Sequence, residues 1–215
     1  MEAAGERIAD ILIDAIDEHG NGCAALSGGS TPEPAYRALA LTQSDWDLIT
    51  FALVDERFVP PSNPASNQRM IEDALHWPLR RGAKLAPMFS VAESIEQAAD
   101  HADALYKALR IDVALMGMGE DGHTASWFSD ARGLDVALDA NTTRSVIAIN
   151  APNAPGSADR LTLTRNALKR ARGLVLVITG DAKRARLEQA LAAHDAPVAA
   201  LFGADMPPIE VLWTA

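Results

Sequence analysis

The segment Leu115–Phe128 places a carboxylate and an imidazole two residues apart in a glycine-rich turn. Asp121 and His123 flank Gly122 there, and the apolar run Asp112–Met116 comes just before the turn. A carboxylate beside an imidazole can orient the ring and raise its basicity, as general-base catalysis requires. His123 is therefore a candidate catalytic residue, and Asp121 is a candidate for orienting it. The alternative is a structural histidine that only ties the loop together.

A second group of charged residues follows another apolar run. Asp55, Glu56 and Arg57 come directly after Leu48–Val54. In α/β sheets, ligands bind beyond the carboxyl ends of the strands. Asp55 and Arg57 are therefore candidates for substrate binding, and Arg57 could stabilise a developing oxyanion. A solvated loop with a local ion pair is the alternative.

A third group could bind an anion. The run Cys23–Leu26 leads into a turn of glycines and hydroxyl residues, namely Ser27, Gly28, Gly29, Ser30, Thr31 and Pro32. Glycines let the backbone approach an anion, which hydroxyls and free N–H groups can then hold. The hydroxyls and the early proline also predict a capped helix start, so a turn without a ligand remains the alternative. No lysine follows the glycines, which argues against a nucleoside triphosphate loop.

Two cations near predicted strand ends could complete a phosphate pocket. Arg160 could bind a phosphate as a bidentate fork, and Lys183 could act as a point charge. Each of these cations taken alone would be read as a surface charge. The pocket prediction therefore depends on both of them lying near the turn that begins at Ser27.

Two cofactor hypotheses find little support in the sequence. Gly117, Gly119 and Gly122 match the bare dinucleotide-binding pattern, but Glu120 and Asp121 would direct carboxylates at a pyrophosphate. The chain has no His-x-x-x-His pair and no cysteine pair, so we expect no metal. The four other histidines fall on or beside predicted helices and are expected at the surface: His19, His76, His101 and His194.

Composition sets limits on the class of protein. The chain has 215 residues, of which 48% are hydrophobic and 22% charged, so it can form a core without disulfides or metals. The net charge of −10 argues against general binding of nucleic acid or anionic membranes, although a small phosphorylated ligand remains compatible. No apolar run has the 18 or more residues of a membrane span, and the acidic start Met1–Arg7 lacks a signal-peptide layout. The lone Cys23 is expected to be a small core residue in a cytoplasmic protein.

The elements that must position these residues alternate between strands and helices. Alternation of this kind predicts an α/β fold with a mostly parallel sheet covered by helices on both faces, in one domain over residues 1–215. The residues 130–143 remain unassigned. Predicted strands are Cys23–Leu26, Leu48–Val54, Lys84–Phe89, Asp112–Met116, Ser145–Ile149, Arg160–Thr164, Gly173–Thr179 and Ile209–Trp213. Predicted helices are Ala3–Glu18, a stretch through Tyr36 to Leu41, Ser66–His76, Ser90–Leu109, Asn166–Arg170 and a stretch from Gly180 through Leu191.

Taken together, the blocks have the order and spacing of a known family. The chain resembles the 6-phosphogluconolactonases over nearly its whole length, from about Ala9 to Trp213. The resemblance rests on Leu26–Pro32, Asp55–Pro60, Ser66, Asn67, Met70, Gly117–Ser126, Arg160–Thr164 and Gly180–Lys183. It implies a Rossmann-like sheet of the type shared with glucosamine-6-phosphate deaminase and ribose-5-phosphate isomerase. It also implies hydrolysis of 6-phospho-D-glucono-1,5-lactone to 6-phospho-D-gluconate in the oxidative pentose phosphate pathway, without a metal or organic cofactor.

The resemblance departs from the family pattern in one loop and in a short N-terminus, and it leaves two alternatives. The family usually reads Ser-Leu-Phe-Pro-Gly where this chain reads Ser-Trp-Phe-Ser-Asp, over Ser126–Asp130. Deaminase relatives share the phosphate turn and the Asp-Gly-His block, but a glutamate partners their histidine close to the position of Phe128. Phe128 cannot act as an acid or base, which favours the lactonase. A sugar-phosphate sensor without turnover is the second alternative, and the sequence does not define an oligomeric state.

The lactonase reading assigns roles to the candidate residues. His123 would act as general base and return its proton to the leaving ring oxygen. Asp121 or Asp55 would orient His123 or hold sugar hydroxyls, and Arg57 would stabilise the oxyanion. The 6-phosphate would be held by Ser27, Gly28, Gly29, Ser30, Thr31, Arg160 and Lys183.

Overall fold

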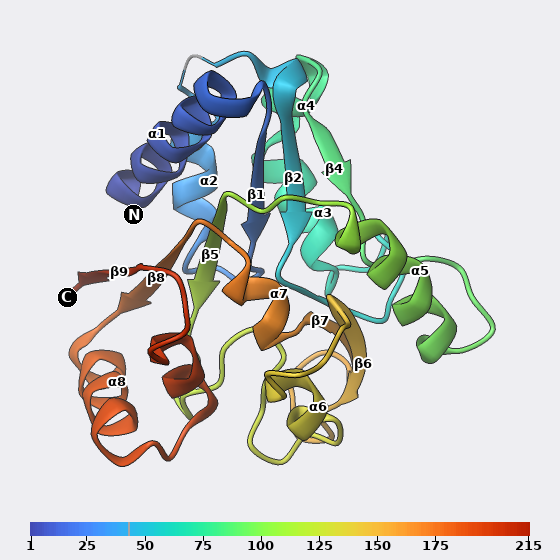
Figure 1. Cartoon of the computed structure of the whole chain (residues 1–215), viewed down its shortest axis with the longest axis vertical. Helices are drawn as coiled ribbons and strands as arrows, with labels where there is room; N and C mark the ends of the chain where they lie inside the picture. Colours follow the sequence, from blue (N-terminus) through green and yellow to red (C-terminus); the bar gives the residue numbers. More distant parts are fainter. Residues whose placement is uncertain (43) are drawn as a thin grey trace.

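A six-stranded parallel sheet forms the centre of the protein, which we describe from a computed structural model covering residues 1–42 and 44–215 (Figure 1). Its strand order is β4-β2-β1-β5-β8-β9, and all five neighbouring pairs run parallel. This arrangement confirms the predicted mostly parallel α/β sheet. The strands are β4 (Lys84–Ala86), β2 (Ile49–Leu53), β1 (Gly22–Leu26), β5 (Val113–Gly117), β8 (Gly173–Thr179) and β9 (Ile209–Thr214).

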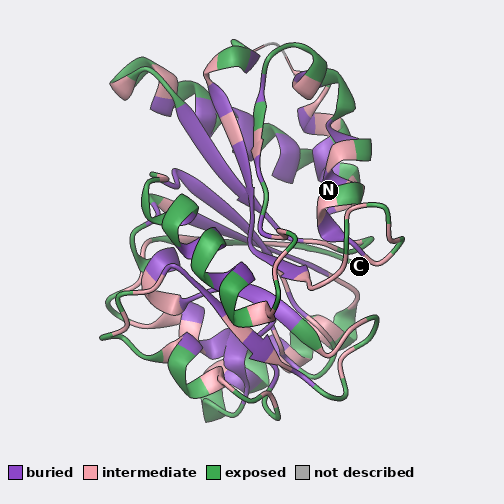
Figure 2. Ribbon diagram, turned by 90° about the vertical axis from the view of Figure 1, so that its right-hand side faces the viewer, coloured by how far each residue is buried: buried purple, intermediate pink, exposed green. Residues whose placement is uncertain are grey.

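Burial along the central strands shows that both faces of the sheet are covered. All five residues of β1 are buried, and successive side chains of a strand point to opposite faces. Figure 2 shows the central strands as buried, with the exposed residues gathered on the helices and loops around them. The short apolar runs of the sequence therefore form two-sided core strands, and Cys23 is a buried core residue as predicted.

Helices surround this sheet. In the first helix, α1, the buried side chains include Ile8, Leu12 and Ala15, and the helix ends at Gly20, which has a left-handed φ of 84°. Among the described residues, no helix is both long and apolar enough to cross a membrane. The helices are α1 (Glu2–His19), α2 (Glu33–Leu39), α3 (Asn67–Ala74), α4 (His76–Arg80), α5 (Ile95–Lys107), α6 (Leu134–Leu138), α7 (Arg165–Lys169) and α8 (Asp181–Ala193), with 3₁₀ turns over Trp46–Leu48 and Pro197–Phe202.

A second, antiparallel sheet has the strand order β3-β7-β6, with β3 at Asp55–Arg57, β7 at Asp159–Leu163 and β6 at Val146–Asn150. Asp55–Arg57 lies beyond the carboxyl end of β2, as the sequence predicts, but the sequence gives no sign that these three residues form a strand of their own. The chain leaves β2 at Val54, whose N–H still donates to Leu26 of the central sheet, while its carbonyl accepts from the N–H of Leu163. Val54 thus joins the two sheets, and β3 pairs with a strand about a hundred positions later, a contact that no local pattern reveals.

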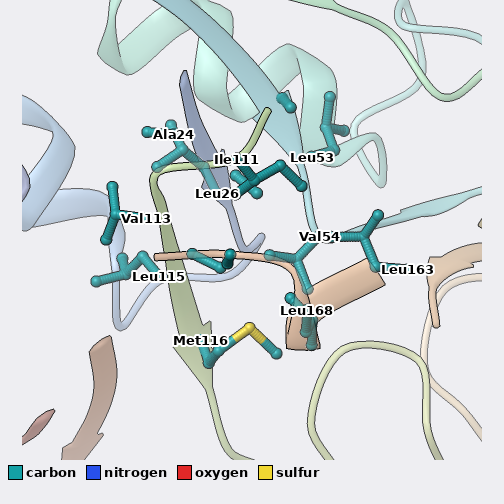
Figure 3. Close-up of a cluster of buried hydrophobic side chains, with 14 of the residues drawn as sticks. Ala24, Leu26, Leu53, Val54, Ile111, Val113, Leu115, Met116, Leu163 and Leu168 are labelled. Carbon is teal, nitrogen blue, oxygen red and sulfur yellow. The ribbon is translucent and has the colours of Figure 1, made fainter. Parts of the chain in front are cut away.

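The apolar side chains of the two sheets meet in one core. Figure 3 shows Leu26, Leu53 and Leu115 of the central strands gathered with Val54, and Leu163 and Leu168 beside them. All of these side chains belong to the same buried cluster. The second sheet is therefore fixed against the first by apolar packing as well as by hydrogen bonds.

Helix starts differ from several predictions. Helix α5 begins at Ile95 rather than Ser90, because the Ser94 side chain accepts from Gln97 N and caps it. Helix α2 begins after Pro32 without any side-chain cap, so the predicted Ser/Thr cap is wrong. The hydroxyls before Pro32 are thereby left free of a capping role.

One histidine was also misjudged. His19 was expected at the surface, but its Nε2 lies 3.1 Å from Oδ1 of the fully buried Asp112. Asp112 also accepts from Cys23 N (2.9 Å). The pair ties the end of α1 to the starts of β1 and β5, at the edge of the sheet where these strands begin.

Candidate active site

The site lies where the order of the central sheet reverses. From β1 the chain moves to β2 and β4 on one side, and it later returns to β5, β8 and β9 on the other. Loops that leave neighbouring strands in opposite directions open a crevice at their carboxyl ends. The loop after β1 begins at Ser27, whose Oγ donates to Leu115 O of β5 (2.7 Å), and this bond joins the two walls.

A pocket of about 240 Å³ occupies this crevice. Every predicted site residue except Asp121 lines it, which brings together residues from five distant parts of the chain. The lining residues are Ser27, Gly28, Gly29, Ser30, Thr31, Pro32, Asp55, Arg57, Asn67, Gly117, Met118, Gly119, His123, Ala125, Arg160 and Lys183.

Asp121 and His123 form a close pair at the edge of the pocket. The His123 Nδ1 lies 2.6 Å from Asp121 Oδ1, and the same oxygen accepts from His123 N (3.1 Å). Burial raises the pKa of the Asp121 carboxyl, but these contacts with His123 outweigh it, so that the pKa is lowered overall. An ionised Asp121 that accepts from Nδ1–H leaves Nε2 as the imidazole nitrogen with a lone pair.

The turn that carries this pair depends on two glycines. Gly122 has a φ of 86°, the left-handed conformation that glycine adopts without strain. An added Cβ at Gly119 would lie 2.2 Å from His123 Nδ1, so the imidazole occupies the space of a side chain there. From outside, Arg186 donates to Asp121 O (3.3 Å). These requirements account for Gly119 and Gly122, two of the three glycines that resemble a dinucleotide fingerprint.

Asp55 lies on the other side of the site, and His123 is not among its nearest polar partners. Its Oδ2 accepts from Ser126 Oγ (2.6 Å) and lies 3.8 Å from Nη1 of Arg160, and its Oδ1 accepts from Asn67 Nδ2 (3.3 Å). The carboxylate is buried and paired on several sides. Of the two aspartates that the sequence left open, Asp121 is therefore the one in contact with His123.

Arg57 is held at the pocket wall through one terminal nitrogen of its guanidinium. Its Nη1 donates to Ala65 O (3.0 Å) and to Asn67 Oδ1. Among the described residues, its Nε has no hydrogen-bond partner. The guanidinium is thus fixed at one end only, with the cation facing a pocket that also holds Asp55.

The proposed phosphate side combines the turn after β1 with Arg160 and Lys183. Gly29 has a φ of 101°, which turns the backbone as glycine allows. Lys183 lies in the first turn of α8 and lines the same pocket. Arg160 is only 3% exposed, and it donates to the carbonyls of Ser157 and Pro155. Burial lowers the pKa of Arg160, which the charge of Asp55 opposes, so this cation is built into the wall rather than free at the surface.

Among residues 1–42 and 44–215, no group of three or more His, Cys, Asp or Glu side chains lies close enough together to hold a metal ion.

Residues 1–213 match the family model described as glucosamine-6-phosphate isomerases/6-phosphogluconolactonase. The chain belongs to this family.

Individual members of the glucosamine-6-phosphate isomerase/6-phosphogluconolactonase family show the same likeness over nearly the whole chain. A 6-phosphogluconolactonase of Rhizobium meliloti is 39% identical, over 99% of this chain and 93% of the relative. A 6-phosphogluconolactonase of Pseudomonas aeruginosa is 38% identical, over 96% of this chain and 87% of the relative. The crystal structure of a 6-phosphogluconolactonase from Shewanella baltica superposes with a TM-score of 0.91 at 32% identity, covering 98% of this chain and 91% of that one.

Phe128, close to the place where the resemblance puts the glutamate of deaminase members of the family, touches the histidine directly. Its ring stacks on His123 with centroids 4.0 Å apart and 25° between the planes. Arg160 also lies over the Phe128 ring, with its Cζ 5.2 Å from the centroid. The aromatic ring thus occupies a face of His123 without offering an acid or base.

Sequence reasoning missed two residues of the site. Asn67 was quoted in the family blocks but given no role, although it contacts both Asp55 and Arg57. Ser126 has no predicted role beyond its place in a loop, although it is buried and donates to Asp55. The position of Asn67 directly after a helix-capping serine was the available signal, since it places the side chain at the start of a helix. Nothing comparable pointed to Ser126.

Proposed function

We propose that this protein hydrolyses 6-phospho-D-glucono-1,5-lactone to 6-phospho-D-gluconate, the lactonase step of the oxidative pentose phosphate pathway. The observation that carries the proposal is that one pocket holds His123, paired with Asp121, together with the glycine and hydroxyl turn and Lys183. A phosphorylated sugar lactone matches both parts of this pocket. Its electrophilic carbonyl suits the histidine, and its phosphate suits the turn and Lys183. The relatives named 6-phosphogluconolactonase support the same substrate class.

The reaction needs an activated water, a place for negative charge and a proton for the leaving oxygen. In our proposal Nε2 of His123 takes a proton from water as the oxygen attacks the lactone carbonyl carbon. Asp121 holds the ring and stabilises the imidazolium through Nδ1. The imidazolium then gives the proton to the ring oxygen as the carbon–oxygen bond breaks, so that the net change is the addition of one water.

The opposite wall would stabilise charge and fix the substrate. Arg57 faces the oxyanion that forms on the carbonyl oxygen, a type of interaction often worth about 3 kcal/mol. Asp55 accepts hydrogen bonds from sugar hydroxyls, while Arg160 balances its negative charge. The turn after β1 and Lys183 hold the 6-phosphate, and positioning of this kind can supply much of the rate.

The second candidate is a deaminase. It would need an acid or base next to His123, and Phe128 fills that position with a hydrocarbon ring. Ammonia release from glucosamine 6-phosphate by the wild-type protein would favour the deaminase over the lactonase. A sugar-phosphate sensor without turnover is distinguished by binding 6-phospho-D-gluconate while leaving the lactone at its spontaneous rate of hydrolysis.

Charge reversal at Lys183 tests the phosphate assignment. We expect Lys183→Glu to raise KM for the phosphorylated lactone at least about tenfold, since one phosphate contact is lost and a repulsion is added, and to leave unphosphorylated gluconolactone nearly unaffected. The matched control is Arg184→Glu, because Arg184 is the next residue of α8, pairs with Glu188 and does not line the pocket. Steady-state kinetics with both lactones measures the effect, and equal changes for the two substrates would contradict the assignment.

A further inference from the structure

Asn67 lies between Asp55 and Arg57, and its side chain contacts both of them. It is the first residue of α3, it is 2% exposed, and it lines the pocket. Its Nδ2 donates to Asp55 O (2.8 Å) and to Asp55 Oδ1 (3.3 Å), while its Oδ1 accepts from Arg57 Nη1. The side-chain amide therefore bridges an anion and a cation that face the same pocket.

The chemistry at the two ends of the amide fixes its orientation. Both atoms near Nδ2 are acceptors, and the guanidinium near Oδ1 can only donate. Rotating the amide by 180° would place its NH₂ against the Arg57 donors and its oxygen against two acceptors of Asp55. A primary amide meets both needs in one orientation, and a carboxylate of the same shape meets only the contact with Arg57.

Residues behind Asn67 hold it in place. The buried carboxylate of Glu56 accepts from Asn67 N (2.8 Å), from Gln68 N (2.7 Å) and from Ser66 Oγ (2.9 Å). It also accepts from Arg57 N (2.7 Å), so the same group fixes the backbone of both partners. Glu56 is fully buried and does not line the pocket. Its carboxylate instead accepts hydrogen bonds from the first residues of α3.

The phosphate turn packs directly on the same amide. An added Cβ at Gly28 would lie 1.8 Å from Asn67 Oδ1, so Gly28 is needed for Asn67 to reach Arg57. This close approach links the turn after β1 to the Asp55 and Arg57 wall. Asn67 thus contacts three parts of the pocket from a single, rigidly held position.

We propose that Asn67 is the positioning residue of the Asp55–Arg57 wall, setting the guanidinium of Arg57 for the oxyanion; the inference rests on the proposed lactonase function. The side chain acts through its two neighbours. Its removal should therefore lower kcat, where oxyanion stabilisation counts, more than it raises KM, which the phosphate contacts dominate.

The kinetic test compares Asn67→Asp and Asn67→Ala with wild type. We expect each variant to lower kcat by about 10- to 100-fold and to change KM by less than about threefold. Asn67→Asp keeps the shape and the Arg57 contact but sets a carboxylate oxygen against Asp55, so it separates positioning from packing. The matched control is Asn166→Ala, since Asn166 donates to Thr142 O (2.7 Å) away from the pocket. A rise in KM without loss of kcat, or an equal effect in the control, would overturn the inference.

A double-mutant cycle tests whether Asn67 acts through Arg57. In an Arg57→Lys background we expect Asn67→Ala to lower kcat by less than about threefold, because the group that it positions is already gone. Independent, multiplicative losses would overturn the proposed route through Arg57.

A spectroscopic measurement separates failure of this inference from failure of the proposed function. The Arg57 side-chain N–H signal, assigned by its loss in Arg57→Lys, should be resolved in ¹⁵N spectra of wild type and Asn166→Ala, and broadened or lost in Asn67→Ala, which removes the acceptor of Arg57 Nη1. If wild type does not hydrolyse the lactone, the proposed function fails while this result still decides the role of Asn67. An unchanged Arg57 signal in Asn67→Ala would overturn the positioning role whatever the activity.

Discussion

At the scale of single residues, Gly119 determines whether His123 and Asp121 can meet. A Cβ at position 119 would lie 2.2 Å from both Nδ1 and Cε1 of the His123 ring and 2.7 Å from Asp121 Oδ1. Such distances are far below contact distance, so the imidazole would have to move. The ring is also confined by Phe128 at a 4.0 Å centroid distance, which limits where it can go.

We therefore expect Gly119→Ala to lower kcat for 6-phosphogluconolactone by about 100-fold, since a misplacement of about 1 Å can have this effect. Gly173→Ala is the matched control, because a Cβ there would meet only Pro208 O at 3.9 Å, outside the pocket. Kinetics of both variants, with thermal unfolding to show that both fold, measure the effect. Activity of Gly119→Ala close to that of the control would show that the ring position seen here is not needed.

Residue types alone pointed to residues that line both sides of one pocket, but not to the contacts between them. Asp121 and His123 are two positions apart, so a local pattern indicates their pairing. The choice between Asp55 and Asp121 could not be made from sequence, because the partners of Asp55 are Ser126 and Arg160, brought near only by the fold. Contacts across more than seventy positions leave no periodic signal along the chain.

At the scale of elements, Asp103 of α5 anchors a strand of the second sheet. Its buried Oδ1 accepts from the backbone N–H groups of Ser145 (2.6 Å) and Val146 (3.2 Å), where β6 begins. Burial raises the pKa of Asp103, but Lys107 and these N–H donors, with Arg144, outweigh it and lower the pKa overall. Because the pKa in the folded state lies below that of the unfolded state, the carboxylate stabilises the fold at neutral pH.

We expect Asp103→Asn to reduce the free energy of unfolding at pH 7 by about 2 kcal/mol, the usual size for hydrogen bonds to a buried charge. Asp103 contributes fully above the pKa of about 3.9 that holds in the unfolded chain, and the contribution is lost as pH falls through the lower folded pKa. Urea unfolding at pH 7 and at pH 3 should therefore show a smaller difference between variant and wild type at pH 3.

Asp100→Asn serves as the control for this prediction. Asp100 pairs with Arg144 at 2.7 Å but its side chain is 64% exposed, so its removal should change stability by less than about 1 kcal/mol. A difference for Asp103→Asn that stays constant from pH 7 to pH 3 would show that its charge does not stabilise the fold.

The elements predicted from periodicity were mostly correct, and the elements that were missed share a cause. Strands such as β8 and β5 were predicted because continuous burial leaves an uninterrupted apolar run. Strand β3 has only three residues, all charged, and forms because β7 offers it a partner. Helix α6 lies in the segment that the sequence left unassigned, and it has only five residues. Short elements of this kind depend on tertiary contacts more than on local preference.

At the scale of the whole molecule, the pocket lies where two sheets meet and where cations gather within an acidic protein. The net charge is −10, yet Arg57, Arg160 and Lys183 all line the pocket. The central sheet supplies the turns after β1 and β5, and the second sheet supplies Asp55, Arg57 and Arg160. The parallel sheet could be predicted from sequence, but the junction of the two sheets could not, since it depends on contacts that Val54 makes to both.

The most direct test of the account is the hydrolysis of 6-phosphogluconolactone by wild type and by His123→Ala, each measured above the spontaneous rate at neutral pH. We predict clear turnover by wild type and a loss of about 10²- to 10⁴-fold in kcat for the variant, the usual contribution of a general base. Equal rates for the two proteins would contradict the role of His123, and a wild-type rate no higher than background would contradict the lactonase itself.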